Sequence, residues 1–370
     1  MRRLLAFGTF DLDRHPRARV LLEGLSSTWQ VASLNRPLGF STAERVRMLE
    51  QPWRLGGFAA RLAGRWLQLA AGSLRYRGDR APDALLVGYM GHFDVLLARL
   101  LFPRTVIALD HLIFAAGTAR DRRASGRVLH LVLSALDRAA LAAADVLIMD
   151  TDEHARQLRP RERRRALVVP VGAPARWYRL AQGRHGSRDA DAPLSIVFFG
   201  LFTPLQGTPV IAAALRRLHD DGVAFRATLI GTGQDAERCR EILEGVDEVT
   251  WVPWLEGADL AETVADHDVC LGIMGSTPKG LDVVPNKVYQ GLAAGCAVVT
   301  SDTPPQRRVL GDAVDYAPPG DAAALAAVLA RLSREPAARR ALQVRGRARA
   351  DELRGDRLVQ DLDDRLRRRG

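Results

Sequence analysis

The chain has 370 residues, which is long for a single hydrophobic core and favours two domains. Hydrophobic residues make up 47% and charged residues 26%, an ordinary globular composition that excludes a disordered chain. The formal net charge of +10 indicates an anionic partner, such as nucleic acid, a membrane surface or a phosphate-bearing substrate; an arginine-rich composition with solvated basic faces explains it equally well.

The chain is expected to be cytoplasmic. Its three cysteines, Cys239, Cys270 and Cys296, lack the spacing of a disulfide framework or a metal site, which fits a reducing compartment. No apolar run is long enough to span a bilayer. The first residues, MRRLLAFGTFDLDRHPR, are predicted to form a buried strand and its loop rather than a signal peptide.

Short aliphatic runs alternate with helical patterns along the whole chain. Apolar residues recur at i, i+3, i+4 and i+7 in segments such as 125–143 and 208–222, which predicts helices there. The alternation predicts an α/β fold with two parallel sheets, each covered by helices on both faces. Strands are predicted at 2–8, 29–34, 83–89, 105–110, 145–150 and 166–171, and then at 194–200, 226–231, 248–253, 267–273, 296–301 and 313–317.

A polar segment rich in Gly, Ser and Pro, RLAQGRHGSRDADAP at 179–193, separates the two sets of strands. The predicted domains are therefore 1–176 and 194–349, joined by a linker at 177–193 and followed by a basic helix at 350–370. Asp189 and Asp191 fit a DxD metal pattern, but they lie in the linker, away from any strand end. No metal site is predicted there.

The helical segment at 47–77 is amphipathic, with one apolar face and one face that carries arginines. Arginines gather on one of its faces, and an interfacial membrane helix combines such residues with tryptophan. The alternative is a long helix packed against its own domain. The apolar face consists of Leu55, Phe58, Leu62, Trp66 and Leu69.

Of the 53 Lys plus Arg residues, only Lys279 and Lys287 are lysines. Asn286 and Lys287 follow Pro285 and fall in the first turn of a short predicted helix, which ends at Gly295. A cation is unfavourable at the positive end of a helix unless an anion is bound there, so a phosphate would remove the conflict. A solvated lysine at a helix start is the alternative.

Two further turns, each with a glycine loop between a predicted strand and a predicted helix, could also bind an anion. The strand ending at Gly200 is followed by a loop with Thr203 and Gly207 and by a helix that begins near Thr208. The loop with Gly231 and Gly233 likewise joins a strand to a helix. Strand, glycine loop and helix start together form an anion site at the carboxyl end of a parallel sheet.

Taken in order, FFGLFTPLQG, LIGTGQD, VPW and PNKVYQGLAAGCAVVTSDTP resemble the donor-binding domain of GT-B glycosyltransferases of the GT4 type (group 1). The first half agrees in outline through GTFDLDRHPR, ALDHLIF, the pair Asp121–Arg122 and ADVLIMDTDEHA. The resemblance covers most of the chain. It implies two Rossmann-like domains facing across a cleft, with the C-terminal helix returning to the first domain.

The resemblance also implies the activity. Such an enzyme, of class EC 2.4, moves a sugar from a nucleotide-diphosphate sugar to an acceptor hydroxyl with retention of configuration. The donor is expected mainly on 194–349 and the acceptor, a glycan, a lipid-linked molecule or a small molecule, mainly on 1–176. Peripheral contact with an anionic membrane, at its inner face, is a further expectation, and no nucleic acid or cofactor is expected.

The resemblance implies which residues bind the donor: Gly200, Thr203, Gly207, Gly231, Gly233, Trp254, Asp282, Asn286, Lys287 and Gln290. The sequence departs from the family pattern in two places. Leu201 and Gln206 stand where the family has an arginine and a lysine, and Asp282 and Gln290 stand where it has two glutamates. Lys287 is therefore expected to be the remaining side-chain cation on the diphosphate, with Lys279 flanking it.

Retaining enzymes of this type stabilise the leaving diphosphate by placed charge. Asp110 and His111 end a predicted strand of the first domain and, with Lys287, are the catalytic candidates. His111 is expected to orient a hydroxyl, with a capping or core role as the alternative. Gly8 and Arg17 are expected to face the acceptor. Because helix dipoles neutralise the donor, no metal is expected and activity should survive EDTA.

Three rival functions remain open on the sequence. The missing charged pair suggests a catalytically weakened scaffold or subunit that only binds nucleotide sugars. A nucleic-acid binder would explain the net charge, but the chain lacks aromatic–basic interleaving and any recognised module. An NAD-dependent oxidoreductase would need a GxGxxG after the first strand, which is absent.

Overall fold

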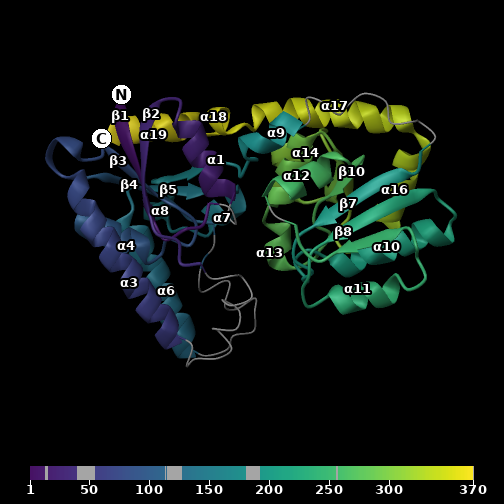
Figure 1. Ribbon diagram of the computed structural model, residues 1–370, viewed down its shortest axis with the longest axis horizontal. Coiled ribbons are helices and arrows are strands. Elements are labelled where there is room, and N and C mark those ends of the chain that lie inside the picture. The colour runs from purple at the N-terminus through teal and green to yellow at the C-terminus, as the bar shows by residue number, and fades with distance from the viewer. Residues whose placement is uncertain are drawn as a thin grey trace. The chain divides into compact units, whose positions relative to one another are not determined.

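The computed structural model describes residues 1–12, 16–39, 55–112, 114, 127–180, 192–255 and 257–369. The chain divides into two compact units, one of Met1–Val169 with Leu358–Gly370 and the other of Pro170–Arg357. Each unit is a twisted parallel sheet with helices on both faces, as Figure 1 shows. The α/β prediction with two Rossmann-like units is confirmed.

The first sheet has six parallel strands in the order β2-β1-β3-β4-β5-β6. The strand order reverses between β1 and β3, which is the switch point of the sheet. All six strands were predicted from the sequence. Their bounds are β1 Arg2–Gly8, β2 Trp29–Asn35, β3 Ala84–Val87, β4 Val106–Asp110, β5 Val146–Met149 and β6 Ala166–Val168.

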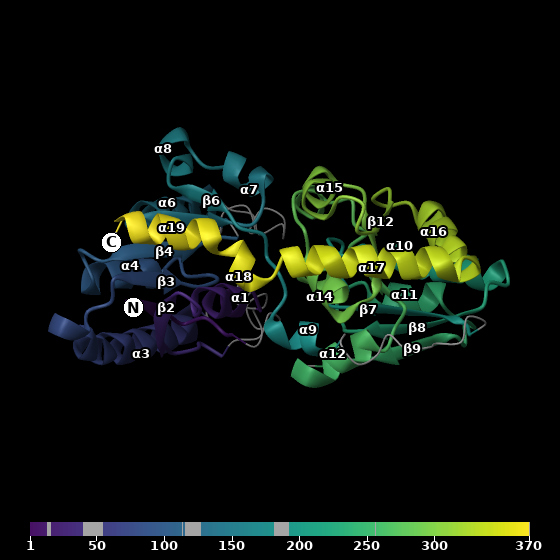
Figure 2. The same cartoon turned by 90° about the horizontal axis from the view of Figure 1, so that it is seen from above.

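Successive residues of β1 point to opposite faces, so each face has a core of its own. Leu5 and Phe7 belong to the core under α3, α4 and α6, whereas Leu4 packs with residues of α1 and α19. Seen from above, α4 lies between α3 and α6 (Figure 2). The helices of this unit are α1 Pro16–Leu25, α3 Leu55–Ser73, α4 Asp94–Leu101, α6 Arg127–Ala143, α7 Asp152–Arg156, α8 Pro160–Arg163 and α19 Gln360–Arg369, with 3₁₀ turns at Leu74–Tyr76 and Gly78–Arg80.

The second sheet has the order β12-β11-β10-β7-β8-β9, again with all strands parallel. All six of its strands were also predicted, and the order reverses between β7 and β10. The bounds are β7 Leu194–Phe199, β8 Phe225–Ile230, β9 Val249–Val252, β10 Val269–Leu271, β11 Ala297–Ser301 and β12 Asp315–Ala317.

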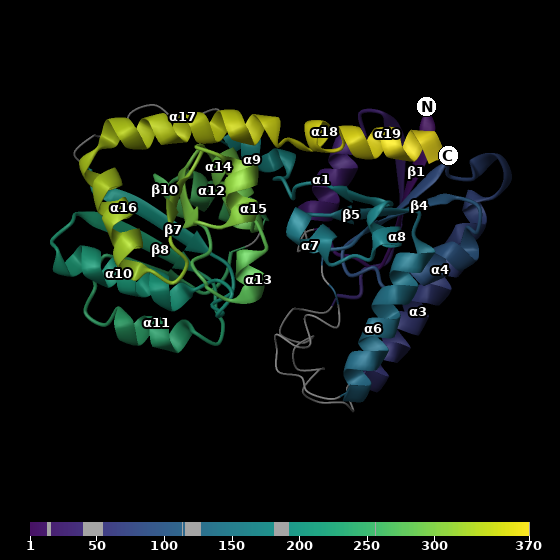
Figure 3. The same ribbon diagram turned by 180° about the vertical axis from the view of Figure 1, so that it is seen from behind.

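Helices cover both faces of this second sheet (Figure 3). Ile211, Leu215 and Leu329 pack α10 and α16 onto one face, and α14 and α17 lie on the other. The helices are α9 Ala175–Leu180, α10 Thr208–Asp220, α11 Ala236–Ile242, α12 Gly257–Ala265, α13 Pro278–Leu281, α14 Asn286–Ala294, α15 Pro304–Leu310, α16 Ala322–Arg334, α17 Pro336–Glu352 and α18 Gly355–Leu358.

The unit boundaries differ from the predicted 176 and 350. Trp177, expected in the linker, is fully buried and stacks on Phe199 at 5.9 Å between ring centroids. Tyr178 donates a hydrogen bond to the carbonyl oxygen of Ala350 at 3.0 Å. The second unit therefore begins at Pro170 and keeps the whole of α17. Residues 181–191, with the DxD pattern, lie outside the described residues.

The predicted return of the C-terminal helix is confirmed. Leu362 and Leu366 of α19 are fully buried in the core of the first unit. The indole nitrogen of Trp29 donates to the Oδ1 atom of Asp363 at 2.6 Å, and Arg367 lies over the Trp29 ring. Apolar burial thus fastens α19, while its arginines remain at the rim.

The helix predicted at 47–77 is α3, and residues 47–54 lie outside the described residues. Leu62 and Leu69 are buried, and the Nε1 atom of Trp66 donates to the Oδ1 atom of Asp94 at 3.1 Å. The apolar face of α3 therefore packs against its own unit, the alternative that the sequence left open. Among the described helices, none has both the length and the apolar character needed to cross a membrane.

Candidate functional site

The loops that follow β7 and β10 touch one another at the switch point of the second sheet. The amide of Met274 donates to the carbonyl oxygen of Gln206 at 2.9 Å. Gly207 has φ +66°, and a Cβ atom there would lie 2.3 Å from the backbone nitrogen of Gly275. Only glycine permits this approach. Ligands of open parallel sheets bind at such a point.

The loop after β8 joins the same edge. A Cβ atom at Gly231 would lie 1.9 Å from the carbonyl oxygen of Gly200, and one at Gly233 would lie 2.3 Å from that of Phe202. The amide of Phe202 donates to the carbonyl oxygen of Thr232 at 2.9 Å. The two glycine loops predicted from the sequence, with Gly207 and with Gly231 and Gly233, therefore lie at the same edge of the sheet as the loop after β10.

Lys287 extends from the first turn of α14 into this group of turns. Its Nζ atom donates to the Oε1 atom of Gln206 at 2.5 Å and lies 3.8 Å from the centroid of the Phe198 ring. A Cβ atom at Gly200 would lie 3.1 Å from the same Nζ atom. The structure thus brings Lys287 to the turn at Gly200, and its role there remains a prediction.

Lys287 is only 5% exposed. Burial lowers its pKa from 10.5 to about 7, an effect that the neighbouring Cys270 thiol opposes. The Gln206 oxygen and the face of the Phe198 ring are weaker partners for a cation than a carboxylate. A phosphate at this edge would supply the missing negative charge.

The other predicted donor residues are distributed around this edge. Asn286 is exposed at the start of α14, Gln290 is buried one turn later, and Asp282 is half-buried after α13. The carbonyl oxygen of Thr203 accepts the amides of Gln206 and Gly207, so Thr203 closes the loop through its backbone. Their contacts with a donor stay predictions.

Two predicted residues lie further out. Trp254 is 53% exposed and follows β9, the edge strand, which lies two strands from β7. Lys279 is half-buried on α13, whose first turn is capped by the Thr277 hydroxyl accepting the amide of Gly280 at 3.1 Å. Contacts of Trp254 and Lys279 with a donor therefore stay predictions.

In the first unit, the turn after β1 is fixed by a buried carboxylate. The Oδ2 atom of Asp94 accepts the amide of Thr9 at 2.7 Å and its hydroxyl at 2.8 Å. A Cβ atom at Gly8 would lie 2.9 Å from the same oxygen. Burial raises the pKa of Asp94, against the effect of these hydrogen bonds. Gly8 therefore lets α4 dock on the turn, and the predicted acceptor contact is untested.

Arg17, predicted to face the acceptor, is instead 2% exposed inside the unit. Its Nε atom donates to the Oδ1 atom of Asp110 at 2.7 Å, and its two NH groups donate to the carbonyl oxygens of Val169 at 2.8 Å and Met149 at 3.4 Å. Burial raises the pKa of Asp110, and Arg17 opposes that shift. The guanidinium thus joins α1 to the ends of β4, β5 and β6.

His111 lies directly after β4 and is 1% exposed. Its ring packs edge-to-face against His92, with centroids 5.0 Å apart, and against Phe114 at 4.7 Å. Burial, with the nearby His92 as the next cause, lowers its pKa from 6.5 to about 3. The imidazole is therefore neutral at physiological pH, when it can both donate and accept a hydrogen bond.

Four other titratable residues at this edge were not singled out from the sequence. The Nε2 atom of His92 lies 3.1 Å from the Oδ1 atom of Asp137, and the Nδ1 atom of His154 lies 2.5 Å from the Oδ1 atom of Asp150. His92 follows a predicted strand and Asp150 ends another, and this position could have marked them in the sequence as candidates for a site at the carboxyl edge of the sheet. Asp137 lies within α6, where nothing local in the sequence marks it.

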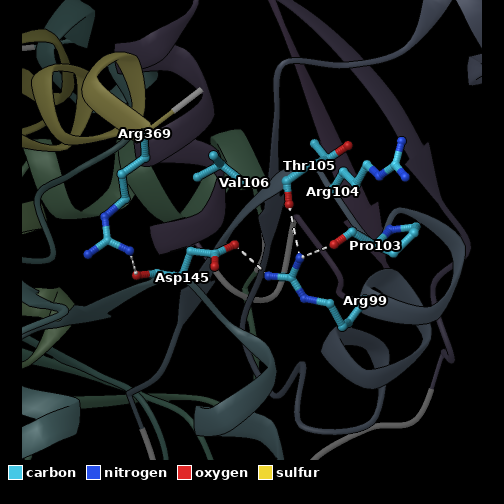
Figure 4. A pocket seen from close by; sticks show the side chains of 7 residues that line it. All are labelled: Arg99, Pro103, Arg104, Thr105, Val106, Asp145 and Arg369. Atoms are coloured by element: carbon cyan, nitrogen blue, oxygen red, sulfur yellow. Dashed lines mark hydrogen bonds and ion pairs between the residues drawn. The ribbon is translucent and has the colours of Figure 1, made fainter.

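A separate pocket of about 270 Å³ lies at the opposite edge of the first sheet, where β4 and β5 begin (Figure 4). Arg99 donates to the carboxylate of Asp145 at 2.5 Å, and Arg369 donates to the Asp145 carbonyl oxygen at 2.9 Å. These arginines fasten the ends of α4 and α19. The lining residues are Arg99, Pro103, Arg104, Thr105, Val106, Asp145 and Arg369.

Residues 193–335 match the sequence model of the family described as Glycosyl transferases group 1. The second unit is a group 1 glycosyl transferase domain. The matched residues include the loops after β7, β8 and β10 and Lys287, so the edge described above lies wholly within this domain.

A related protein is described as a colanic acid biosynthesis glycosyltransferase, WcaL of Salmonella typhimurium. The identity is 30% over 149 residues, which is 38% of this chain. The match spans 36% of the length of that relative. It therefore supports a glycosyltransferase assignment for part of the chain.

Solved structures extend the likeness to the whole chain. Sucrose-phosphate synthase from Thermosynechococcus elongatus matches with a TM-score of 0.69 at 17% identity, over 100% of this chain and 99% of that one. HepE from Anabaena, in complex with UDP, matches with a TM-score of 0.65 at 12% identity, over 100% of both chains. At these identities the likeness shows the fold, and the chain has the two-sheet GT-B fold around its group 1 domain.

Replacing Asp110 tests the buried ion pair of the first unit. Asp110→Ala leaves the Arg17 guanidinium buried without its carboxylate, so unfolding of the unit should become easier by about 3–5 kcal/mol. The matched control is Arg156→Ala, which breaks a pair with Glu153 in the same unit where Arg156 is 67% exposed. That change should cost less than about 1 kcal/mol. Urea denaturation of both variants measures the difference, and equal losses would contradict the assignment.

Proposed function

We propose that the chain is a glycosyltransferase that moves a sugar from a nucleoside-diphosphate sugar to an acceptor hydroxyl. The observation that supports this most directly is the buried Lys287 ammonium, which lies among glycine turns at the switch point of the group 1 domain. The UDP in the HepE complex supports the class of donor. The first unit is proposed to bind the acceptor, and the cytoplasm is the proposed compartment.

The proposed chemistry depends on placed positive charge. As the glycosidic bond breaks, negative charge grows on the departing diphosphate. The Lys287 ammonium and the positive dipole ends of α10 and α14 would stabilise that charge. A metal ion is then unnecessary at the donor. Retention of configuration is proposed on the resemblance to GT4-type enzymes, with His111 as the candidate to orient a hydroxyl.

Thermal shift with UDP-, GDP- and dTDP-sugars tests the donor class. One of these series should raise the melting temperature, since a ligand that binds only the folded state stabilises it. The shift should be the same in EDTA as in Mg²⁺ or Mn²⁺, because protein groups neutralise the diphosphate. A shift that needs added metal would overturn the metal-free donor site, and no shift with any series would overturn the donor class.

Lys287 is the residue on which the proposal depends most. Lys287→Ala should lower kcat by about 10²–10³, because its contact strengthens as the leaving group gains charge. Lys287→Arg should restore only part of the rate, since a planar guanidinium does not reproduce a point contact in a tight turn. Initial rates and donor affinity measure both effects.

Lys279→Arg provides the control, since it alters the other lysine of the chain outside this contact. Its rate should stay near that of the unaltered protein. Turnover of Lys287→Ala close to normal would show that the diphosphate lies elsewhere.

Donor binding should also depend on pH through Lys287. The pKa of its free ammonium is about 7, and a bound diphosphate would raise it. Below pH 7 the amine is protonated with or without donor, so this group adds no pH dependence. Above pH 7 binding takes up a proton, and the donor Kd should rise by up to about tenfold per pH unit.

Calorimetry at pH 8 in two buffers of different ionisation enthalpy measures that proton. A nucleotide sugar is the right probe, because its diphosphate has no terminal phosphate to titrate. Lys287→Ala should bind with no proton uptake. Equal uptake by both proteins would assign the proton to another group.

A nucleotide-sugar-binding scaffold is the second candidate. The replacement of two family cations by Leu201 and Gln206 favours it, because fewer charges then stabilise the transition state. An assay of donor binding and nucleotide release distinguishes the scaffold from the enzyme. A scaffold binds the donor with normal affinity but releases no nucleotide with any acceptor, unless a partner protein is added.

Peripheral contact with an anionic membrane is proposed for the solvent side of α3. Leu67 of α3 is 73% exposed, and Leu74, in the 3₁₀ turn that follows α3, is 58% exposed, with the exposed Arg75 and Arg77 after it in the chain. The sequence of α3 contains no acidic residue. Exposed leucine next to arginine is what an interfacial helix needs.

Replacing Leu67 and Leu74 together by serine should release the protein from anionic liposomes without unfolding it, because both side chains are already exposed. Val344→Ser on α17 is the control, since Val344 is 71% exposed in the other unit. Cosedimentation measures the bound fraction. If the unaltered protein does not sediment with anionic liposomes, the exposed leucines have no membrane role.

A further inference from the structure

Three buried side chains from three elements meet at the carboxyl edge of the first sheet. His92 comes from the turn after β3, His111 follows β4, and Asp137 projects from α6. One nitrogen of each ring and one carboxylate oxygen lie within 4.8 Å of one another. All three residues are less than 8% exposed.

The separations fit a metal ion. Zn²⁺ binds histidine nitrogen and carboxylate oxygen at about 2.0–2.2 Å in tetrahedral sites, which places neighbouring ligand atoms about 3.4 Å apart. The Nε2 atom of His92 and the Oδ1 atom of Asp137 are already 3.1 Å apart. The widest separation therefore has to close by about 1–1.5 Å when the ion binds.

His111 supplies an independent reason for a ligand. Its Nε2 atom is buried and, among the described residues, has no hydrogen-bond partner. Such an atom is unfavourable if it stays unpaired, because it has lost its hydrogen bonds to water. His92 and Asp137 contact each other, whereas the Nε2 atom of His111 is left without such a contact among the described residues. An ion shared by all three would satisfy it.

We propose that His92, His111 and Asp137 bind one zinc ion. The donor set of two imidazoles and one carboxylate suits Zn²⁺ better than Mg²⁺ or Ca²⁺, which prefer oxygen ligands. Three protein ligands leave one tetrahedral position for a water molecule or a hydroxyl oxygen. The site belongs to the first unit, so it is independent of the metal-free donor site proposed for the second.

A second pair of a histidine and an aspartate lies at the same edge of the sheet, and it provides a comparison with the three proposed ligands. Asp150 and His154 lie four residues apart and contact each other at 2.5 Å. The Thr151 hydroxyl caps α7 by accepting the amide of His154 at 3.2 Å, so local structure accounts for this pair. His92, His111 and Asp137 are far apart in the chain and come together only through the fold.

Metal analysis of the whole protein tests the proposal. Protein equilibrated with Zn²⁺ and then desalted should retain about one zinc per chain, and His92→Ala or Asp137→Ala should reduce this at least tenfold. His130→Ala is the matched control, because His130 is exposed on the same helix as Asp137. His154→Ala should also retain the ion, since its pair lies outside the set.

Cobalt substitution tests the unaltered protein, in case the variants do not fold. Co²⁺ should give the visible absorption of a four-coordinate ion with no near-ultraviolet thiolate band, because all three cysteines lie in the second unit. Zinc retained by both His92→Ala and Asp137→Ala, a thiolate band, or no retained metal in the unaltered protein would each overturn the proposal.

Discussion

Both sheets contain only parallel strands, and this constraint governs the rest of the molecule. A parallel strand has to be followed by a crossover, so helices cover both faces and every carboxyl end reaches the same edge. The loops at that edge are the places where the chain can vary without disturbing the core. In each unit the residues of functional interest therefore gather after β1, β3 and β4, or after β7, β8 and β10.

Close packing at these edges buries charged side chains, and the two units differ in how far a buried cation is compensated by its partners. In the first unit, Arg17 is paired with Asp110 and two carbonyl oxygens. In the second, Lys287 has an amide oxygen and a ring face as its described partners, and burial lowers its pKa to about 7. A satisfied buried pair fixes structure, whereas an under-satisfied cation is ready for an anionic ligand.

The first unit is built from both ends of the chain. Trp29, near the start, lies against Asp363 and Arg367 of α19. Leu362 and Leu366 complete the core on that face of the sheet. Residues of α1 and α19 therefore share one core with those of β4 and β5.

The sequence by itself determined the twelve strands, the two sheets, the glycine turns and the place of Lys287 in the first turn of α14. These features follow from local patterns: buried runs, turn glycines and the proline before a helix. Tertiary structure decided which face of α3 is buried, that Trp177 belongs to the second unit, and that Arg17 is buried against Asp110, whereas the sequence predicted that it faces the acceptor. It also brought Asp137 to His92, 45 residues earlier in the chain. Such contacts depend on how helices dock on a sheet, and no local pattern of residues encodes the partner that each polar side chain meets.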